Sequence, residues 1–317
     1  MFLFESISGY GWLGFFGVLF GLILVNELTR RNKWLSIAVY LVLPIVLTFT
    51  LWPKTAGKGS SVGSWFAWAK VYSALAGCVG FMALRYVKGL SDKKWLLAFP
   101  PLILSINIME AVIREFQSFS FNGVVDGLLI IGGPWNIMNG IAGILNIITI
   151  SGWVGIMISR DKSKDMIWAD QLWFWIIAYD LWNFAYVYNC IPDHAFYAGA
   201  ALLISCTIPA FFIKKGAWLQ HRAQTLGLWM MFAMSYSTFM DASVFTVRSS
   251  HNTTALMIVS FIALAFNVGV FVYHFNKIIK HKRNPFTTEV HTDLKIFQDI
   301  VKDNAPLVEG KKSKQMA

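Results

Sequence analysis

The sequence is poor in charged residues, which make up 14% of its 317 positions, against about 25% in soluble domains. Hydrophobic residues make up 56% and aromatic residues 16%, and the mean hydropathy is +0.55. This composition excludes soluble, fibrous and disordered proteins. Several apolar runs approach the roughly 20 residues that cross about 30 Å of hydrocarbon as a helix, so we expect an integral membrane protein.

Cysteine and metal-binding patterns are scarce. The three cysteines, Cys78, Cys190 and Cys206, lie within or beside apolar runs and show no CxxC spacing. The six histidines show no HxxxH or HExxH spacing, and no P-loop is present. These absences argue against a disulfide-rich secreted protein, a membrane zinc protease and a nucleotide-binding enzyme, and we expect neither a metal nor a cofactor.

The chain carries an excess of positive charge, with a formal net charge of +10. Its basic residues stand in short blocks between apolar runs and are not gathered in one water-exposed module, so we expect no nucleic-acid partner. The expected partners are the lipid bilayer and a small-molecule or ion ligand. The oligomeric state cannot be read from these features.

Nine apolar runs are long enough to be interpreted as membrane-spanning helices, with several residues of error at each boundary. We therefore expect an all-α, polytopic membrane bundle over residues 1–280 and a tail over residues 281–317. The nine runs lie near residues 10–28, 34–52, 64–86, 95–113, 133–158, 167–189, 195–213, 224–247 and 254–276.

Basic residues alternate from one connection to the next. Every odd-numbered connection holds a basic cluster, the tail from Lys277 onward holds nine Lys and Arg, and the even-numbered connections hold few. Because short cytoplasmic connections concentrate Lys and Arg, the pattern predicts an outside N-terminus and an inside C-terminus in the cell membrane. The N-terminus also lacks the basic region and cleavage site of a signal peptide, so we expect the first span to be retained as an anchor.

The tail contains a helical repeat of apolar residues. Asn284 before Pro285 is a candidate helix start, and the residues that recur at spacings of 4, 3 and 4 are Val290, Leu294, Phe297 and Val301. We expect a short amphipathic cytoplasmic helix that rests on the bundle or the lipid surface. A regulatory docking helix is the alternative.

Residues 116–133 separate the fourth and fifth spans and are too short to cross the membrane. The apolar stretch 124–131 ends in Gly132, Gly133 and Pro134, which is compatible with a re-entrant segment. An ordinary outer loop packed on the bundle is the favoured interpretation, because irregular backbone at membrane depth needs protein or water around it.

The fourth span places polar residues on one face. Asn107, Glu110 and Arg114 follow at intervals of 3 and 4, so Glu110 is expected to pair with Arg114 one turn away. Glu115 is expected to point elsewhere. Ionisable groups in a span cost on the order of 2.5–3.5 kcal/mol on insertion scales, so they normally face a partner or a cavity.

The fifth span carries a stripe of amides and glycines at helical spacing. Its members are Gly132, Asn136, Asn139, Gly143 and Asn146. Amides donate and accept hydrogen bonds, and glycines let a ligand or another helix approach closely. Helix-packing contacts explain the same stripe without any ligand.

The sixth span combines an acid with aromatic residues. Asp180 and Asn183 share one face, and Tyr179, Trp182 and Tyr186 line the adjacent one. A carboxylate beside aromatic rings suits an organic cation. An interfacial aromatic belt with a buried hydrogen bond to Asp180 is the alternative.

The eighth span repeats this pattern of an acid and a base on one face. Asp241 and Arg248 lie two turns apart, about 10 Å at 1.5 Å per residue, so each needs a partner from another helix. In the expected topology Glu110 and Asp180 reach a similar depth to Asp241. The three acids are therefore expected to converge on one polar chamber, paired there with basic residues such as Lys70 or Arg114, or left to carry protons.

These residues lead to a functional hypothesis of a transporter or permease for a small polar or cationic solute, with H⁺ or Na⁺ as candidate coupling ions. Asp180 and Asp241 are assigned to the charge of the solute or ion, and Glu110 with Arg114 to a gate. The remaining candidate binding residues are Asn107, Asn136, Asn139, Asn146, Trp182, Asn183, Tyr186 and Arg248. The alternatives are a membrane enzyme acting on a lipid, and a non-catalytic sensor or assembly subunit.

Overall fold

The computed structural model describes residues 2–57 and 59–304. The chain is mostly helical with little sheet, and the described residues contain six helical segments long and apolar enough to cross a membrane. The six segments are Gly9–Arg31, Lys33–Thr50, Trp65–Tyr86, Lys94–Ser118, Pro192–Phe212 and Thr253–His281. Length and composition therefore support a membrane protein, as the hydropathy of the sequence predicts.

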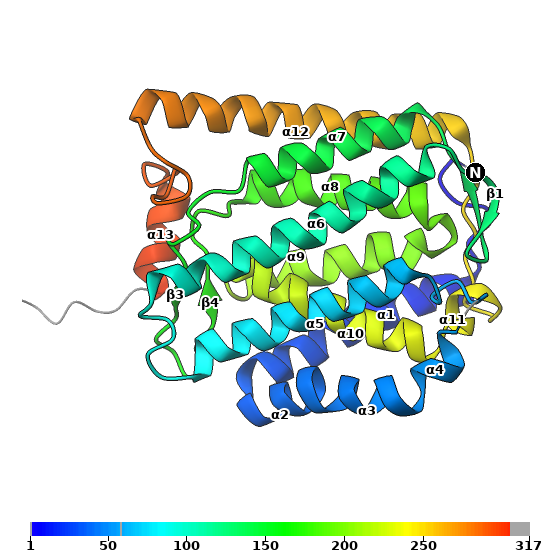
Figure 1. The fold of residues 1–317 in the computed structure, drawn as a ribbon, viewed down its shortest axis with the longest axis horizontal. Coiled ribbons are helices and arrows are strands. Elements are labelled where there is room, and N and C mark those ends of the chain that lie inside the picture. The colour runs from blue at the N-terminus through cyan, green and yellow to red at the C-terminus, as the bar shows by residue number, and fades with distance from the viewer. Residues whose placement is uncertain (1, 58, 305–317) are drawn as a thin grey trace, which may run out of the picture.

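The elements follow one another along the chain as Figure 1 shows. The helices are α1 (Gly9–Arg31), α2 (Lys33–Ile37), η1 (Ala38–Val42), α3 (Leu43–Thr50), α4 (Trp52–Thr55), α5 (Trp65–Tyr86), η2 (Lys94–Ala98), α6 (Phe99–Ser118), α7 (Pro134–Ile148), α8 (Trp173–Cys190), η3 (Pro192–His194), η4 (Ala195–Ala201), α9 (Leu202–Phe212), α10 (Trp218–Ser235), α11 (Thr238–Asp241), α12 (Thr253–His281) and α13 (Lys295–Asn304). The strands are β1 (Asn122–Val125), β2 (Leu128–Ile131), β3 (Met157–Ile158) and β4 (Met166–Ile167).

The long helices lie side by side, with α12 along one edge of the bundle and α2 and α3 along the opposite edge (Figure 1). Helix α7 packs against α6 and α12, α8 packs against α7 and α12, and α10 packs against α5 and α9. Helices α8 and α10 bury residues on nearly every side, whereas α1 and α3 expose large apolar side chains such as Phe20 and Phe49. This distribution suits a bundle whose outer surface faces lipid.

Local sequence explains where several of these helices start and how closely they pack. Ser8 and Asn252 cap α1 and α12 by accepting hydrogen bonds from backbone N–H groups of the first turn. Gly143 of α7 lies so close to α6 and α8 that an added Cβ would meet Val112 at 2.5 Å and the indole nitrogen of Trp182 at 2.7 Å. The expected role of this glycine in close helix packing is therefore realised.

The limits of the expected spans differ most from the observed helices in two places. The span expected over 133–158 ends at Ile148, and at Gly152, which has a φ of +63°, the chain turns beside Asp170. The span expected over 224–247 is instead α10, which runs from Trp218 to Ser235 and leaves Asp241 in the short helix α11. Hydropathy placed the start of α10 too late because its first turns are polar, although they are buried inside the bundle.

Residues 122–131 form a β-hairpin of two antiparallel strands, β1 and β2, at one end of the bundle (Figure 1). The tight turn contains Asp126 and Gly127, both with positive φ. Ile130 is fully buried and Val124 is exposed, so one face of the hairpin packs against the bundle and the other is exposed. The segment is therefore a hairpin packed on one end of the bundle, and its expected place on the outer side of the membrane stays a prediction.

The tail helix begins later than the sequence suggests. Asn284 and Pro285 lie in a turn, in which Asn284 accepts hydrogen bonds from the backbone of Phe286 and Thr288, and α13 starts at Lys295. Phe297 and Ile300 pack against the bundle around Ile167, Ala169 and Leu172. Residues 305–317 of the expected tail lie outside the described residues.

The N-terminal segment and α13 lie at opposite ends of the bundle (Figure 1). The end that carries α13 also collects basic residues from several odd-numbered connections. Arg30 pairs with Asp165, Arg85 donates to the carbonyl oxygens of Ser163 and Lys164, and Lys214 pairs with Asp161. The odd-numbered connections therefore meet around residues 159–165.

Candidate functional site

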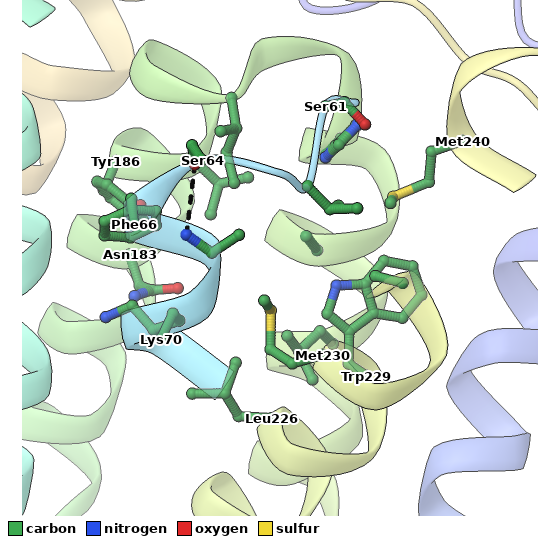
Figure 2. A pocket seen from close by; sticks show the side chains of 18 of the residues that line it. Ser61, Ser64, Phe66, Lys70, Asn183, Tyr186, Leu226, Trp229, Met230 and Met240 are labelled. Carbon is green, nitrogen blue, oxygen red and sulfur yellow. Dashed lines mark hydrogen bonds between the residues drawn. The ribbon is translucent and has the colours of Figure 1, made fainter. Parts of the chain in front are cut away.

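A pocket lies inside the bundle between α5, α8, α9 and α10 (Figure 2). Its cavity volume is about 70 Å³, so the pocket is small. Phe66, Leu226 and Trp229 belong to its largely apolar wall. The polar side chains in its depth are Lys70, Asn183, Tyr186 and Arg222.

Lys70 of α5 is buried, and its charge is compensated. Its Nζ donates to the carbonyl oxygen of Asn107 at 2.7 Å and lies 3.2 Å from the carboxylate of Glu110. Ser73 donates to the same carboxylate oxygen at 3.1 Å and accepts from the amide of Asn107. Asn107 and Glu110 therefore lie together as predicted, but behind the pocket wall, where they balance Lys70.

Arg222 of α10 is only 4% exposed and has incomplete contacts. Its Nε donates to the hydroxyl of Tyr179 at 3.2 Å, and its Nη2 donates to Oδ1 of Asn183 at 3.3 Å. Its Nη1 is buried without a hydrogen-bond partner, and no carboxylate of the described residues lies within ion-pair distance. Asp180 attracts Arg222 electrostatically without contacting it, and a buried guanidinium without a direct ion pair is costly.

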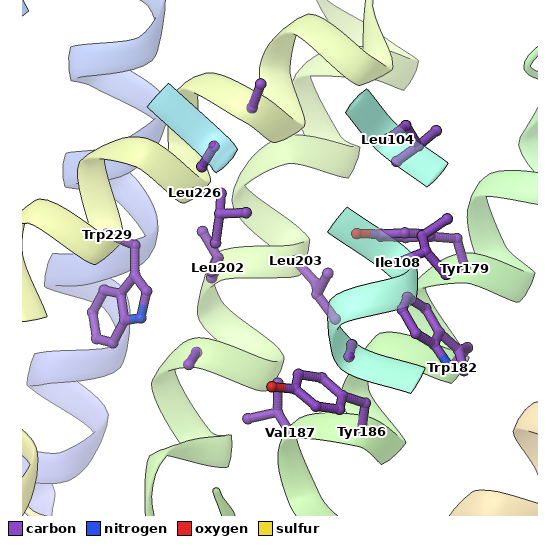
Figure 3. Close-up of a cluster of buried hydrophobic side chains, with 14 of the residues drawn as sticks. Leu104, Ile108, Tyr179, Trp182, Tyr186, Val187, Leu202, Leu203, Leu226 and Trp229 are labelled. Atoms are coloured by element: carbon purple, nitrogen blue, oxygen red, sulfur yellow. The ribbon is translucent and has the colours of Figure 1, made fainter. Parts of the chain in front are cut away.

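Tyr186 supplies a second unpartnered polar group. Its ring packs against Phe66 at a centroid distance of 5.8 Å, and its hydroxyl is buried without a partner. Figure 3 shows this hydroxyl pointing from α8 toward the side on which Leu202 and Trp229 lie. Both of these residues line the same pocket, so the hydroxyl faces it.

The mouth of the pocket is held together by Asp241. Its carboxylate accepts from Ser61 at 2.6 Å and lies 3.0 Å from Nε2 of His194, and both of these partners line the pocket. Burial raises the pKa of Asp241, but the hydrogen bonds from His194 and Ser61 outweigh that effect and hold the pKa below its ordinary value. Asp241 thus joins the segment 59–64 to η3 as an ionised carboxylate.

This rim also contains the serine of a Gly-x-Ser-x-Gly run, Gly59 to Gly63, a spacing known from hydrolase nucleophiles. The serine lies in an irregular segment before α5 and not between a strand and a helix. Its hydroxyl contacts the carboxylate of Asp241, whereas His194 contacts the other carboxylate oxygen. The arrangement lacks the direct contact between nucleophile and histidine that an activated serine needs.

The expected pair of Glu110 with Arg114 is not formed. Glu110 pairs with Lys70, while Arg114 pairs with Asp126 of the hairpin turn at 3.0 Å and lies over the ring of Phe121. The helical spacing correctly places Glu110 and Arg114 on neighbouring turns, but each side chain finds a closer partner on another element.

The prediction that Glu110, Asp180 and Asp241 converge on one chamber is wrong. Asp180 accepts from Thr207 of α9 at 2.6 Å, Glu110 contacts Lys70, and Asp241 lies at the rim. None of the three lines the pocket, whose charged lining residues are Lys70 and Arg222. The chamber is therefore basic, because the acids are used by partners outside it.

Glu115, which was expected to point away from the polar face, is fully buried and central to a separate cluster. Its carboxylate accepts hydrogen bonds from the amides of Asn136 at 2.7 Å, Asn139 at 2.6 Å and Asn189 at 3.1 Å. Asn189 also donates to Ser260 of α12, so the cluster joins α6, α7, α8 and α12. Two members of the predicted amide stripe thus surround a carboxylate and not a pocket.

The remaining predicted residues lie outside the pocket. The indole of Trp182 and the amide of Asn139 donate to each other's backbone carbonyl, and Asn146 donates to the carbonyl of Ala142 in its own helix. Arg248 pairs with Asp193 at 2.9 Å and donates to the carbonyl oxygen of Asp241. Among the predicted residues, Asn183 and Tyr186 alone line the pocket.

Sequence reasoning missed Arg222, which it treated as part of a basic connection. A signal was present, because Gln220, His221, Arg222 and Gln224 stand together immediately before an apolar run. All four are buried, and Gln220 and His221 hydrogen-bond Asp165 and Asn26. Such a polar block is typical of the interior turn of a helix as well as of a connection, and hydropathy does not distinguish the two.

Comparison with known proteins gives one match. No curated protein and no solved structure matches the chain. A family profile matches residues 5–303, which covers nearly all of the described residues. The chain therefore belongs to the family described as a family of unknown function, DUF5692.

Proposed function

We propose that the protein is a permease of the cell membrane that binds a small polar solute in the pocket between α5, α8, α9 and α10. One observation carries this proposal, namely that buried polar groups without partners face a cavity inside an apolar helical bundle. Exposing such groups to a cavity is costly unless water or a ligand satisfies them. A pocket that recognises a solute supplies that partner.

The proposed topology has nine spans, with the N-terminus outside and the C-terminus inside. It adds α7, α8 and α10 to the six apolar segments; these three helices lie in the same bundle and are shorter or more polar. The meeting of several basic connections around residues 159–165 supports this topology, because positive charge concentrates on the inner side. The pocket mouth at Asp241 then faces outward.

The rim contacts of Asp241 supply a gate in this proposal. Release of Ser61 or His194 from the carboxylate would separate the segment 59–64 from η3 and open the mouth. Deeper in the bundle, the pair of Lys70 with Glu110 is a candidate for coupling transport to an ion, because Lys70 lines the pocket and Glu110 supplies its counter-charge.

The basic lining changes the class of solute that the sequence suggested. A cation would meet Lys70 and Arg222 without an acid in the lining, so the pocket favours a solute with hydrogen-bond acceptors. A membrane hydrolase is less well supported, because Ser61 and His194 are not in contact with each other but share a carboxylate.

The proposal is tested in two steps with the full chain. A thermal-shift screen of metabolites on the purified protein identifies solutes that raise its unfolding temperature. The solute with the largest shift is then offered to proteoliposomes, with protein-free liposomes as the control. Saturable uptake is the expected result, while binding without uptake would favour a sensor.

A further inference from the structure

The polar end of the pocket offers donors without acceptors. Nη1 of Arg222 and the hydroxyl of Tyr186 are buried and unpartnered, whereas Nζ of Lys70 already contacts Asn107 and Glu110. A guanidinium nitrogen only donates, and a phenol hydroxyl donates well to an anionic oxygen. The missing partner is therefore an acceptor.

Arg222 also lacks a direct ion pair. Asp180 lies one turn from Asn183 on α8 and attracts Arg222 electrostatically, but its hydrogen bond goes to Thr207 and it does not contact the guanidinium. The lining residues contain no Asp or Glu. An anion in the pocket would supply the direct contact that Asp180 does not make.

We infer that the solute carries a carboxylate, with one oxygen bound by Nη1 of Arg222 and the other by the hydroxyl of Tyr186. This inference rests on the proposed function and narrows its substrate class. The rest of the pocket is apolar, with Leu202, Leu226 and Trp229 among its wall residues, so the solute is a small organic acid with a hydrophobic body.

A phosphate group fits these donors less well. A phosphate has three terminal oxygens and carries nearly two negative charges, so a buried phosphate site needs more donors than two unpartnered groups. A carboxylate has two oxygens in one plane and a single charge, which matches one guanidinium that forms no ion pair.

The test compares matched ligands on the purified full-length protein. A panel of aliphatic and aromatic carboxylic acids of about four to ten carbon atoms is measured against the corresponding primary amides and amines. The expected result is saturable binding of at least one acid, with its amide and amine binding about tenfold or more weakly. Equal binding of an amide or amine, or no binding by any acid, overturns the inference.

Variants assign the effect to the proposed donors. Arg222→Gln is expected to weaken binding of the acid about tenfold or more, and Tyr186→Phe several-fold, because each removes one donor. If Arg222→Gln does not fold, Arg222→Lys is measured in its place. This variant retains the charge and tests whether the planar guanidinium is needed. Arg31→Gln, which removes an exposed arginine, is the matched control. Unchanged affinity in both Arg222→Gln and Tyr186→Phe contradicts the inference.

Uptake separates this inference from the proposed function. Binding of an acid that depends on Arg222, without uptake into proteoliposomes, supports the carboxylate site and contradicts transport. Uptake of a neutral or cationic solute that Arg222→Gln leaves unchanged supports transport and contradicts the carboxylate site.

Discussion

Glu115 and Arg222 are two buried charges whose surroundings differ. Glu115 is fully buried and Arg222 is 4% exposed, and neither forms an ion pair with any residue that the structure describes. Glu115 is surrounded by three amide donors from α7 and α8, so its two oxygens are satisfied. Arg222, which lines the pocket, makes two longer hydrogen bonds, and its third nitrogen is buried without a partner.

The difference separates a structural charge from a charge available to a ligand. Both are costly in a membrane bundle, and neutral hydrogen-bond donors reduce that cost for Glu115 by solvating it inside the protein. The hydrogen bonds of Arg222 are incomplete, and Asp180 attracts it without forming an ion pair. We therefore assign the cluster around Glu115 to stability and the surroundings of Arg222 to binding.

The largest expected effect is on stability at Glu115. Glu115→Ala would remove one acceptor from each of the amides of Asn136, Asn139 and Asn189, at about 1–3 kcal/mol for each buried N–H left unpaired. We expect a loss of at least about 3 kcal/mol, seen as a lower unfolding temperature or as aggregation during purification. Glu5→Gln, which changes an exposed acid, is the control, and equal unfolding temperatures in the two variants would contradict the structural assignment.

Arg222→Gln is expected to give the opposite pattern. It removes a buried charge that forms no ion pair, so we expect the free energy of unfolding to change by less than about 1 kcal/mol while binding of an organic acid falls about tenfold. Thermal unfolding without ligand and titration with the acid measure the two quantities on the same sample. A large loss of stability without ligand would show that Arg222, like Glu115, is structural.

Part of this comparison could be predicted from the sequence. The stripe of Asn136, Asn139 and Gly143 was recognised from its helical spacing, and Gly143 does allow close packing. The expected helical limits were good where apolar runs were uninterrupted, as in α5 and α12. Both successes depend on local periodicity, which a single sequence displays directly.

The partners of the buried charges could not be predicted in this way. Glu115 lies one residue beyond Arg114, so spacing within α6 placed it on another face, but its acceptors are satisfied by α7 and α8. Lys70 and Glu110 come from different helices, and so do Arg222 and Asn183. Side chains on different helices meet only through tertiary packing, which hydropathy and spacing do not specify.

The rim provides a smaller effect that distinguishes gating from binding. In Asp241→Asn an amide replaces a carboxylate that holds both Ser61 and His194, and the amide oxygen can retain only part of those contacts. We expect little loss of stability, because the side chain is partly exposed, but several-fold faster maleimide labelling of the Ala67→Cys variant inside the pocket.

The native cysteines are buried and give a low labelling background. Asp92→Asn in an exposed connection is the control for a lost acid. Unchanged labelling in Asp241→Asn would show that these rim contacts do not limit access to the pocket. The pKa of Asp241 is below its ordinary value, so in the native protein the rim contacts should persist at neutral pH and weaken only as the pH falls below about 4.

The smallest expected effect concerns a buried group that changes its charge with pH. Burial, followed by the nearby charge of Lys277, lowers the pKa of His291 to about 4, and the ring is held against Tyr273 and His274. A histidine whose folded pKa is depressed contributes stability above its ordinary pKa of about 6.5, and this contribution is lost as the pH falls from about 6.5 toward about 4.

Proton uptake by His291 would create a buried positive charge that Asp293 offsets only in part, because burial and Lys277 act more strongly on the ring. Asp170 holds the backbone N–H groups of Val290 and His291, so this segment should loosen locally while the bundle remains folded. We expect amide hydrogen exchange in residues 290–304 to increase, after correction for intrinsic rates, when the pH is lowered from about 7 to about 5. In His291→Gln that increase should be absent, since glutamine does not titrate. An equal increase in the variant would assign the loosening to another titrating group. Arg222, whose Nη1 is buried without a hydrogen-bond partner, would then be the clearer example of an incompletely satisfied charge.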